Sequence, residues 1–494
     1  MTPTQSKRVF AVVCAVFLLS VPWLYRYTAR QIYNPDPFLY AQAAKEVLSG
    51  KRLYLEAWQD KPPLGILAYA VPQLFAPRSY AGICFFFGCC LVAQCLLFWR
   101  MFRSHRGAVL SGMLFIALFP ITLGDFTWPS TEHFSNIVAL GILLVGYTMF
   151  REQRFMPSLC ATVGALVCLA FNVRQNTVVA CLVPFMAILS GRQTLREKLV
   201  GLGVAGTAGL IMWGLILILV VAIGDWKGYL YTVFQYPRAY ARLGNAHSAL
   251  ELARFLFSMT SLPMILALFL GIALGTRFRW FALSVMAAGV LGCLMPLRPF
   301  GHYWVSLFPY VALLIGVALA EGEHVPVQFG WACAGMFAVL VFPRAARQLV
   351  ECRNDAQQLA YREVAGAVDR IAPAGATLMV VGPLGSESIQ FASRLPAANT
   401  FSTAFQLNPP PCTILPRPIE QIFDEYLQQP PTMIVIHRDQ LAATTNSPPP
   451  TNPQRLIKLL AVRYNYDPVA TNREYIIEMR RGAPPQGTGA TSNP

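Results

Sequence analysis

The strongest constraint on this chain is a series of apolar runs, most of them long enough to cross a lipid bilayer. A crossing segment is helical because its backbone groups must pair within it, and it needs about 20 mostly apolar residues to span the bilayer core. Charged residues make up 13% of the 494 residues, roughly half the share in soluble domains. We therefore expect a polytopic α-helical membrane protein with about 11–13 transmembrane helices. The predicted spans are Val9–Tyr25, Tyr80–Trp99, Ala108–Leu123, Phe134–Phe150, Pro157–Phe171, Thr177–Leu189, Leu199–Ile223, Phe257–Thr276, Trp280–Leu297, Tyr303–Ala320 and Val327–Phe342.

The basic residues predict which loops share one side of the membrane. Lys and Arg number 39 against 24 acids, and they punctuate the apolar runs as in cytoplasmic loops, not as on a nucleic-acid-binding surface. The run Leu64–Pro77 is short and contains a proline, so we expect an interfacial helix. This choice places WRMFRSHR, REQRF, GRQTLREK and TRFR together in the cytoplasm. The first run lacks a small-residue cleavage site and is expected to remain as a transmembrane helix.

The same topology places five loops and the end of the chain outside. The loops are Arg26–Pro77, Gly124–Phe134, Phe171–Asn176, Gly224–Arg254 and Leu297–Trp304. We divide the chain into a membrane domain over 1–342, with its first external loop at 26–77, and an extracytoplasmic α/β domain with Pro-rich linkers over 343–494. In that domain TLMVV and TMIVI are typical of buried parallel strands. GPLGSES predicts a strand-to-helix turn, with phosphate binding as the alternative. Most cysteines lie in apolar runs as small hydrophobes, and a single disulfide involving Cys352 or Cys412 stays an alternative.

Charged and aromatic residues of the external loops are candidates for chemistry. Asp36 begins a predicted amphipathic helix, where capping and catalysis are compatible roles. Lys61 precedes two prolines, and its ammonium is expected either to bind a phosphate or to reach lipid headgroups. Arg174 needs a partner, either a phosphate or an acid such as Glu132. Glu132 is alternatively a helix cap, and the aromatic residues of 225–248 suit either a membrane-interface belt or sugar stacking.

These residues carry a family resemblance. Asp36, Tyr40, Gly50, Tyr54 and the DKPPLG of Asp60–Gly65 resemble the first external loop of bacterial family 39-type glycosyltransferases. That group belongs to the GT-C superfamily, with protein mannosyltransferase-like enzymes, aminoarabinose transferases and lipopolysaccharide-core galacturonosyltransferases. The resemblance extends to WPSTEHF, FNVRQN, HYWVSLFPY and GPLGSESIQFASRLPAANTF, and so covers nearly the whole chain.

The resemblance implies a glycosyltransferase of the bacterial inner membrane with a periplasmic active site. Its donor would be a polyprenyl-phosphate sugar, and its acceptor lipid A or core, another glycan, or a protein. Asp36 would be the general base, and Glu132, which matches the family better than Asp125, a second acid that orients acceptor or substrate. Substrate-binding roles would fall to Tyr40, Lys61, Arg174, Arg298, His302 and Tyr303.

Two questions stay open at this stage. Pro37 stands where many relatives have a second acid, so no metal ligands are predicted and a divalent cation remains an alternative. A transporter or flippase of lipid-linked sugars is the first rival, although the chain shows neither a clear internal repeat nor acids within its spans. A non-catalytic membrane scaffold that displays its carboxy-terminal domain is the second.

Overall fold

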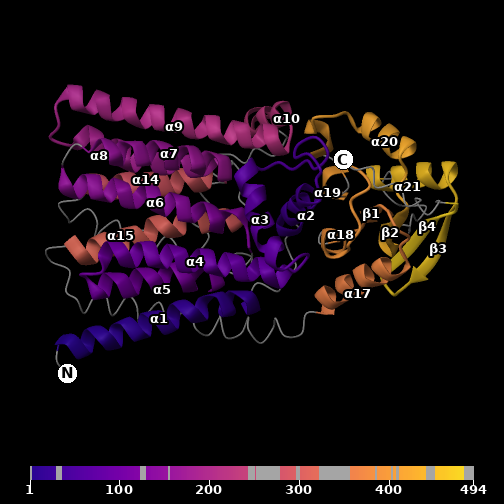
Figure 1. The fold of residues 1–494 in the computed structure, drawn as a ribbon, viewed down its shortest axis with the longest axis horizontal. Helices are drawn as coiled ribbons and strands as arrows, with labels where there is room; N and C mark the ends of the chain where they lie inside the picture. The colour runs from indigo at the N-terminus through magenta and orange to yellow at the C-terminus, as the bar shows by residue number, and fades with distance from the viewer. Residues whose placement is uncertain are drawn as a thin grey trace, which may run out of the picture.

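The computed structural model describes residues 3–28, 36–122, 129–153, 156–242, 251, 279–295, 301–321, 356–383, 386–401, 404–407, 411–440 and 451–482. A bundle of long helices forms one end of the molecule and a small sheet domain the other (Figure 1). The bundle elements are α1 (Pro3–Thr28), α4 (Tyr80–Phe102), α5 (Arg106–Thr122), α6 (Thr131–Glu152), α7 (Pro157–Val173), η1 (Gln175–Cys181), α8 (Leu182–Ser190), α9 (Leu195–Ile223), α14 (Arg279–Leu294), η3 (Gly301–Leu307) and α15 (Phe308–Glu321).

The bundle confirms the prediction of a polytopic membrane protein. Among the described residues, four helices are long and apolar enough to cross a bilayer: Lys7–Arg26, Tyr80–Phe102, Thr131–Glu152 and Leu195–Ile223. Shorter apolar helices lie beside them, and the predicted span Thr177–Leu189 is divided between the 3-10 segment η1 and α8. The predicted spans Phe257–Thr276 and Val327–Phe342 lie outside the described residues. Large apolar side chains on α1 and α9 point outward, as lipid-facing helices require.

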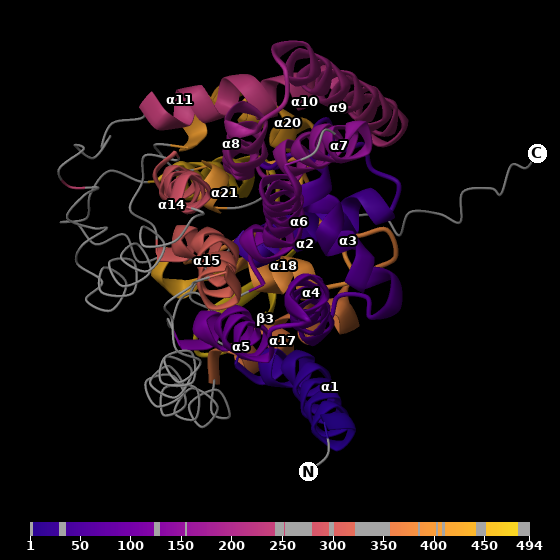
Figure 2. The same cartoon turned by 90° about the vertical axis from the view of Figure 1, so that its left-hand side faces the viewer.

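The interior of the bundle centres on α6. Seen from the amino-terminal end, α6 is surrounded by α4, α7, α8 and α15, and it contacts all four (Figure 2). Successive helices alternate in direction, so the turns at 103–105 and 191–194 lie at the end away from the sheet domain (Figure 1). These are the turns that the basic residues assign to one common side.

Two short helices lie between the bundle and the sheet domain. They are α2 (Asp36–Leu48) and α3 (Pro63–Phe75). Proline precedes α3 and opens it, and the helix runs across the ends of the long helices instead of along them (Figure 1). A Cβ on Gly65 would lie 2.5 Å from the carbonyl oxygen of Val173, so this glycine permits close contact between α3 and the end of α7.

The carboxy-terminal domain is a four-stranded sheet with helices around it. The predicted strands form β1 (Leu378–Val381) and β2 (Met433–His437), which pair in parallel as expected. The strand order is β1-β2-β4-β3, because an antiparallel hairpin of β3 (Tyr466–Thr471) and β4 (Tyr475–Arg480) adds to β2. Its helices are α17 (Ala356–Ile371), α18 (Glu387–Ala392), α19 (Ala404–Leu407), η5 (Pro411–Ile414), α20 (Ile419–Gln428), η6 (Arg438–Gln440) and α21 (Asn452–Arg463).

Local chemistry explains the elements that the sequence analysis predicted and the one that it missed. The GPLGSES segment joins β1 to α18, as a strand-to-helix turn should. The hairpin was not predicted, because its signal is a single side chain: the Asn472 Oδ1 accepts hydrogen bonds from the backbone N–H of Glu474 at 2.9 Å and of Tyr475 at 2.6 Å. This Asx turn reverses the chain between β3 and β4. Cys412 is a free, buried thiol, and Cys352 lies outside the described residues.

Candidate active site

The first external loop is held in shape by its own backbone. It leaves α2 through Gly50, whose φ of +94° favours glycine. Leu53 then bonds the end of α9, with its N–H donating to Ile223 O at 2.9 Å and its carbonyl accepting from Asp225 N at 2.9 Å. Tyr54 has a φ of 66°, which is strained for an aromatic residue. Its hydroxyl donates to the carbonyl of Lys61 at 2.8 Å, so the loop closes on itself just before α3.

Lys61 lies where this closed loop meets the bundle. Its Nζ is 3.0 Å from Asp60 Oδ2 and 5.2 Å from the centre of the Tyr40 ring. Burial by itself lowers the pKa of Lys61, but the carboxylates of Asp60 and Asp36 outweigh it and raise the pKa above its ordinary value. The two acids also raise the pKa of the buried Tyr40 hydroxyl, after burial itself. Asp36, Tyr40 and Lys61 therefore belong to one electrostatic cluster, and the ammonium is charged at neutral pH.

Arg174 provides the second cation, at the end of α7. Its guanidinium forms an ion pair with Glu132, at the start of α6. The Nε donates to Asn176 Oδ1 at 2.8 Å, and the guanidinium carbon lies 5.0 Å from the centre of the Tyr303 ring. Burial is the largest single effect and lowers the pKa of Arg174, but Glu132, Tyr303 and Tyr40 together raise it, so the net shift is upward. Of the two partners that the sequence left open for Arg174, Glu132 occupies this position.

The Arg174–Glu132 pair is buried, with 7% and 1% of the side chains exposed. Removing a charge from water is costly, and an ion pair in such a place survives only with further hydrogen bonds. Thr131 supplies one, since its hydroxyl accepts from Arg174 Nη1 at 3.2 Å. Asn176 in turn is anchored by its amide, which donates to Gly292 O at 2.7 Å. The guanidinium is thus aimed by three different elements of the bundle.

Lys61 and Arg174 line the same cavity. It has a volume of about 730 Å³, counted out to its open mouth, which is a usual size for a small-molecule site. The other lining residues are Asp60, Gln175, Asn176, Tyr236, Pro237, Tyr240, Ala241, Met295 and Tyr303. The cavity therefore combines two cations and the Asp60 carboxylate with aromatic and apolar walls. An anion with an attached ring and an apolar chain would complement such a lining.

One wall of the cavity comes from the loop that follows α9. This loop forms α10 (Trp226–Leu230), the π-helical turn η2 (Tyr231–Gln235) and α11 (Tyr236–Arg242). The rings of Tyr236 and Tyr240 are stacked, with centroids 5.8 Å apart, and Trp58 packs on Tyr236 at 5.3 Å. Short π-helical turns are frequent at functional sites. The sequence analysis left the role of these aromatics open; the structure places two of them on the cavity wall, together with Asp60, which it did not single out.

The remaining predicted residues have different outcomes. Asp36 begins α2 and is partly exposed. Arg298 and the competing acid Asp125 lie outside the described residues. The backbone of His302 is part of η3, and its side chain lies outside the described part of the structure. Within the described ranges, no group of three or more His, Cys, Asp or Glu side chains could hold a metal ion.

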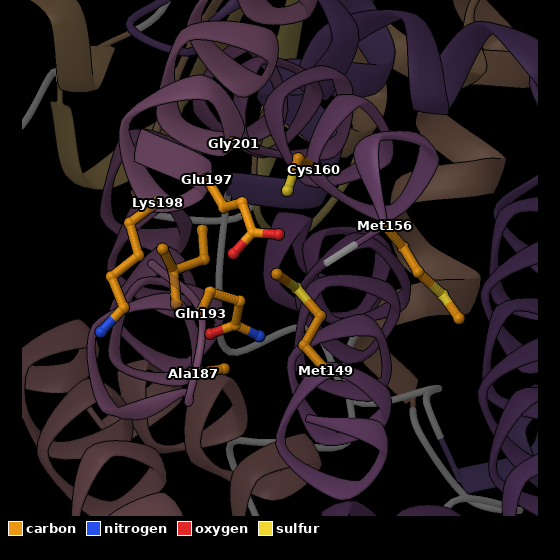
Figure 3. A pocket seen from close by; sticks show the side chains of 9 residues that line it. Met149, Met156, Cys160, Ala187, Gln193, Glu197, Lys198 and Gly201 are labelled. Carbon is orange, nitrogen blue, oxygen red and sulfur yellow. The ribbon is translucent and has the colours of Figure 1, made fainter. Parts of the chain in front are cut away.

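A second hollow among α6, α7, α8 and α9 is much smaller (Figure 3). Two of its polar residues serve the bundle: Glu197 completes a capping box with Thr194 at the start of α9, and Lys198 donates to Leu189 O at 2.7 Å. These side chains are therefore accounted for by helix capping, and the larger cavity is the candidate site.

Comparison with known proteins shows which fold the chain has. No protein-family model and no curated protein matches the chain. Among solved structures, ArnT from Cupriavidus metallidurans bound to undecaprenyl phosphate aligns with a TM-score of 0.57 over 97% of this chain and 98% of that one, at 14% identity. Apo ArnT from the same organism gives a TM-score of 0.59 over 96% and 98%, at 13% identity. The chain has the GT-C fold.

A third GT-C structure shares the fold over a shorter part of its own length. The arabinofuranosyltransferase AftD from mycobacteria aligns with a TM-score of 0.53 at 16% identity, over 96% of this chain and 40% of AftD. Each of these alignments includes both the bundle and the carboxy-terminal domain, since almost all of this chain is covered. The expected GT-C architecture with a carboxy-terminal α/β domain is thus confirmed.

Proposed function

We propose that this GT-C protein is a membrane glycosyltransferase that moves a sugar from a polyprenyl-phosphate donor to an acceptor outside the cytoplasm. The observation that carries the proposal is the pair of cations, Lys61 and Arg174, on one cavity. Asp36 does not line this cavity, but its carboxylate acts electrostatically on Lys61. The ArnT structure with undecaprenyl phosphate supports a donor of this class for the same fold. We place the site on the periplasmic face of a bacterial inner membrane, because the basic turns lie at the opposite end of the bundle.

The two cations would hold the donor phosphate. Phosphate is the leaving group when the anomeric carbon is attacked, so positive charge beside it stabilises the transition state. Both cations are oriented before any ligand arrives, Lys61 by Asp60 and Arg174 by Glu132. We therefore infer that Glu132 orients Arg174 and, through Arg174, the substrate. Tyr40 and Tyr303 lie against the two cations and limit where they can point.

Asp36 is the proposed general base. The acceptor oxygen attacks the anomeric carbon, the bond from that carbon to the phosphate oxygen breaks, and the polyprenyl phosphate leaves with the electron pair. The proton of the acceptor passes to the Asp36 carboxylate. Asp36 is partly exposed, and its carboxylate is close enough to Lys61 to raise the pKa of that lysine. It therefore lies near both solvent and a cation that would bind the phosphate. Lipid A or core, another glycan, and protein are the candidate acceptors.

The test compares Asp36→Asn with the wild-type protein in membranes supplied with a panel of synthetic polyprenyl-phosphate sugars. Mass spectrometry of the lipids and envelope glycans reports transfer. Asp36→Asn should insert normally and lose transfer by about 10²-fold or more, the usual contribution of a general base. Asp439→Asn is the matched control, since its side chain is 85% exposed and lies in the sheet domain. Normal transfer by Asp36→Asn would remove this acid from the mechanism, and donor crossing vesicles with its anomeric bond intact would favour the flippase instead.

A further inference from the structure

The helix that carries Asp36 is covered on two sides by different domains. α3 packs against one side of α2, and α18 of the carboxy-terminal domain packs against it as well. Near the start of α2, the Phe38 ring lies 6.1 Å from Phe391 of α18 and 4.8 Å from Tyr80 of the bundle. The sequence predicts an amphipathic helix here, yet nearly every residue from Pro37 to Glu46 is buried. The carboxy-terminal domain accounts for the difference, because it covers the polar side of α2.

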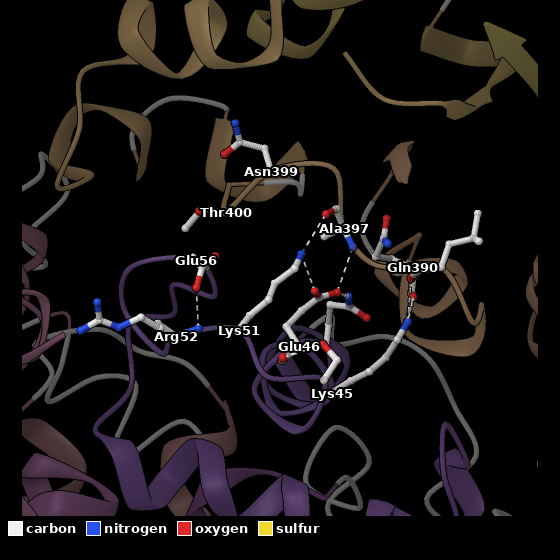
Figure 4. Close-up of polar contacts among 12 residues, drawn as sticks. Lys45, Glu46, Lys51, Arg52, Glu56, Gln390, Ala397, Asn399 and Thr400 are labelled. Atoms are coloured by element: carbon white, nitrogen blue, oxygen red, sulfur yellow. Dashed lines mark hydrogen bonds and ion pairs between the residues drawn. The ribbon is translucent and has the colours of Figure 1, made fainter. Parts of the chain in front are cut away.

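The polar side of α2 carries a half-buried lysine, Lys45, near its end (Figure 4). Lys45 Nζ donates to the carbonyl oxygens of Gln390 at 3.0 Å, Ser393 at 2.6 Å and Leu395 at 3.0 Å. An ammonium has three N–H donors, so all of them are used by one short segment of the carboxy-terminal domain. Burial lowers the pKa of Lys45 to about 8, the direction expected for an ammonium that protein groups partly screen from water.

The neighbouring acid makes the reciprocal contact (Figure 4). Glu46 Oε1 accepts from the backbone N–H of Ala397 at 2.9 Å, and Oε2 is 2.6 Å from Lys51 Nζ. Lys51 Nζ also donates to the Ala397 carbonyl at 3.1 Å. Only 4% of the Glu46 side chain is exposed. The residue pair Glu46 and Lys51 thus satisfies both backbone groups of Ala397, as a neighbouring strand would.

The segment bound by α2, residues 393–398, is itself fixed to the sheet. We call it the strap. Leu378 of β1 donates its N–H to Pro396 O at 3.0 Å and accepts from the N–H of Ala398 at 3.0 Å. Ser393 Oγ donates to Asp369 Oδ1 of α17 at 2.6 Å. The strap therefore has one edge on β1 and the other on α2, and it transmits the position of the sheet to the helix.

The carboxy-terminal domain also holds the part of the loop that leads to Lys61. The Leu55 carbonyl accepts from Thr400 Oγ1 and from Arg417 Nη2, both at 3.1 Å. The Trp58 ring packs against Phe401, with centroids 5.5 Å apart. The same domain therefore contacts the loop before Tyr54, at Lys51, and after it, at Leu55 and Trp58. The hydroxyl of Tyr54 in turn donates to the Lys61 carbonyl.

We propose that the carboxy-terminal domain is a positioning element of the active site, with Glu46 and Lys51 as its positioning residues. Through their hydrogen bonds to α2 and the following turn, the strap and its neighbours fix the positions of Asp36 and Lys61 relative to Arg174 of the bundle. Neither Glu46 nor Lys51 lines the cavity, so they act through the helix and not on the substrate. The assignment of what is positioned rests on the proposed function, whereas the mechanical coupling does not.

Hydrogen exchange in the full-length protein tests the coupling directly. Glu46→Gln and Lys51→Met should each speed amide exchange in 36–48 by about tenfold or more, the factor for losing one bond to a charged group. Exchange in α20 and α9 should not change. Lys51→Arg should restore slow exchange, because it keeps the cation opposite Glu46. Asp467→Asn is the control, since it breaks an exposed ion pair with Arg481 at the far edge of the sheet.

Every outcome decides the proposal. Unchanged exchange in 36–48 for both variants would overturn it. A rise in α20 as well would show that the contacts serve the folding of the domain, and would overturn it too. If the proposed function is also right, Glu46→Gln should lower kcat while the affinity for undecaprenyl phosphate falls less than in Lys61→Met. If neither the wild-type protein nor any variant shows turnover, but the variants still exchange faster in 36–48, the result would count against the proposed function alone.

Discussion

The buried pair of Glu132 and Arg174 offers the sharpest test of the site. Two unit charges about 4 Å apart interact by about 4 kcal/mol at the effective dielectric constant of a protein site, and removing one partner of a buried pair costs about 3–5 kcal/mol. Glu132→Gln keeps the shape and one acceptor oxygen. Arg174 also keeps Asn176 and the Tyr303 ring as partners. We therefore expect Glu132→Gln to lower the free energy of unfolding by about 3 kcal/mol, at the lower end of that range.

A double-mutant cycle measures this value. Glu132→Gln, Arg174→Met and the double variant are compared by unfolding in detergent. The double variant should be more stable than the sum of the single losses predicts, with an interaction energy of about 3 kcal/mol, because it leaves no buried charge alone. Glu425→Gln is the control, since its pair with Arg417 is about one-quarter exposed and should contribute about 1 kcal/mol or less.

The same variants separate a structural pair from a phosphate site. In Glu132→Gln the guanidinium lacks its carboxylate, and a bound phosphate would replace the missing charge. Undecaprenyl phosphate should therefore stabilise Glu132→Gln more than it stabilises the wild-type protein, and should stabilise Arg174→Met least. Equal stabilisation of all three would refute the idea that Arg174 faces the donor phosphate. Strictly additive losses in the cycle would refute the energetic argument itself.

Two further predictions concern the elements that bring the cations together. Lys61→Met should weaken binding of undecaprenyl phosphate by about tenfold or more in a direct binding assay, because a charge-assisted hydrogen bond is lost. Arg78→Met is the control and should leave binding unchanged, since the Arg78 side chain is 40% exposed and pairs with Asp369 outside the cavity. Gly65→Ala should lower stability by about 1–3 kcal/mol in thermal unfolding, since its Cβ would lie 2.5 Å from Val173 O and force α3 away from α7. Unchanged binding by Lys61→Met would return that lysine to a headgroup contact, and an unchanged melting temperature for Gly65→Ala would show that the two helices separate at no cost.

Part of the candidate site could be predicted, since Lys61, Arg174 and Tyr303 line the cavity and lie next to strong local signals. Asp36, Lys61, Glu132 and Arg174 each flank an apolar run, and the alternation of spans assigns them all to one side of the bilayer. Periodicity also predicted the first two strands of the carboxy-terminal domain, since buried parallel strands are short continuous apolar runs. Asp60 and the pair of Tyr236 and Tyr240 were not singled out. Aromatic residues near a membrane interface are common, so their composition alone does not separate a lipid contact from a cavity wall.

The order of the membrane-spanning segments and the side on which each loop lies follow from hydropathy and charge, because the bilayer penalises each buried polar group independently of the rest of the fold. The local sequence therefore determines both properties. Which acid pairs with Arg174, and what covers α2, depend on contacts between residues about 40 and 350 positions apart. Glu46 and Lys51 look like ordinary solvated charges in the sequence. Only the docked strap, with its backbone groups unpaired on one edge, turns them into buried partners, because the low dielectric between two packed domains makes an unsatisfied amide costly.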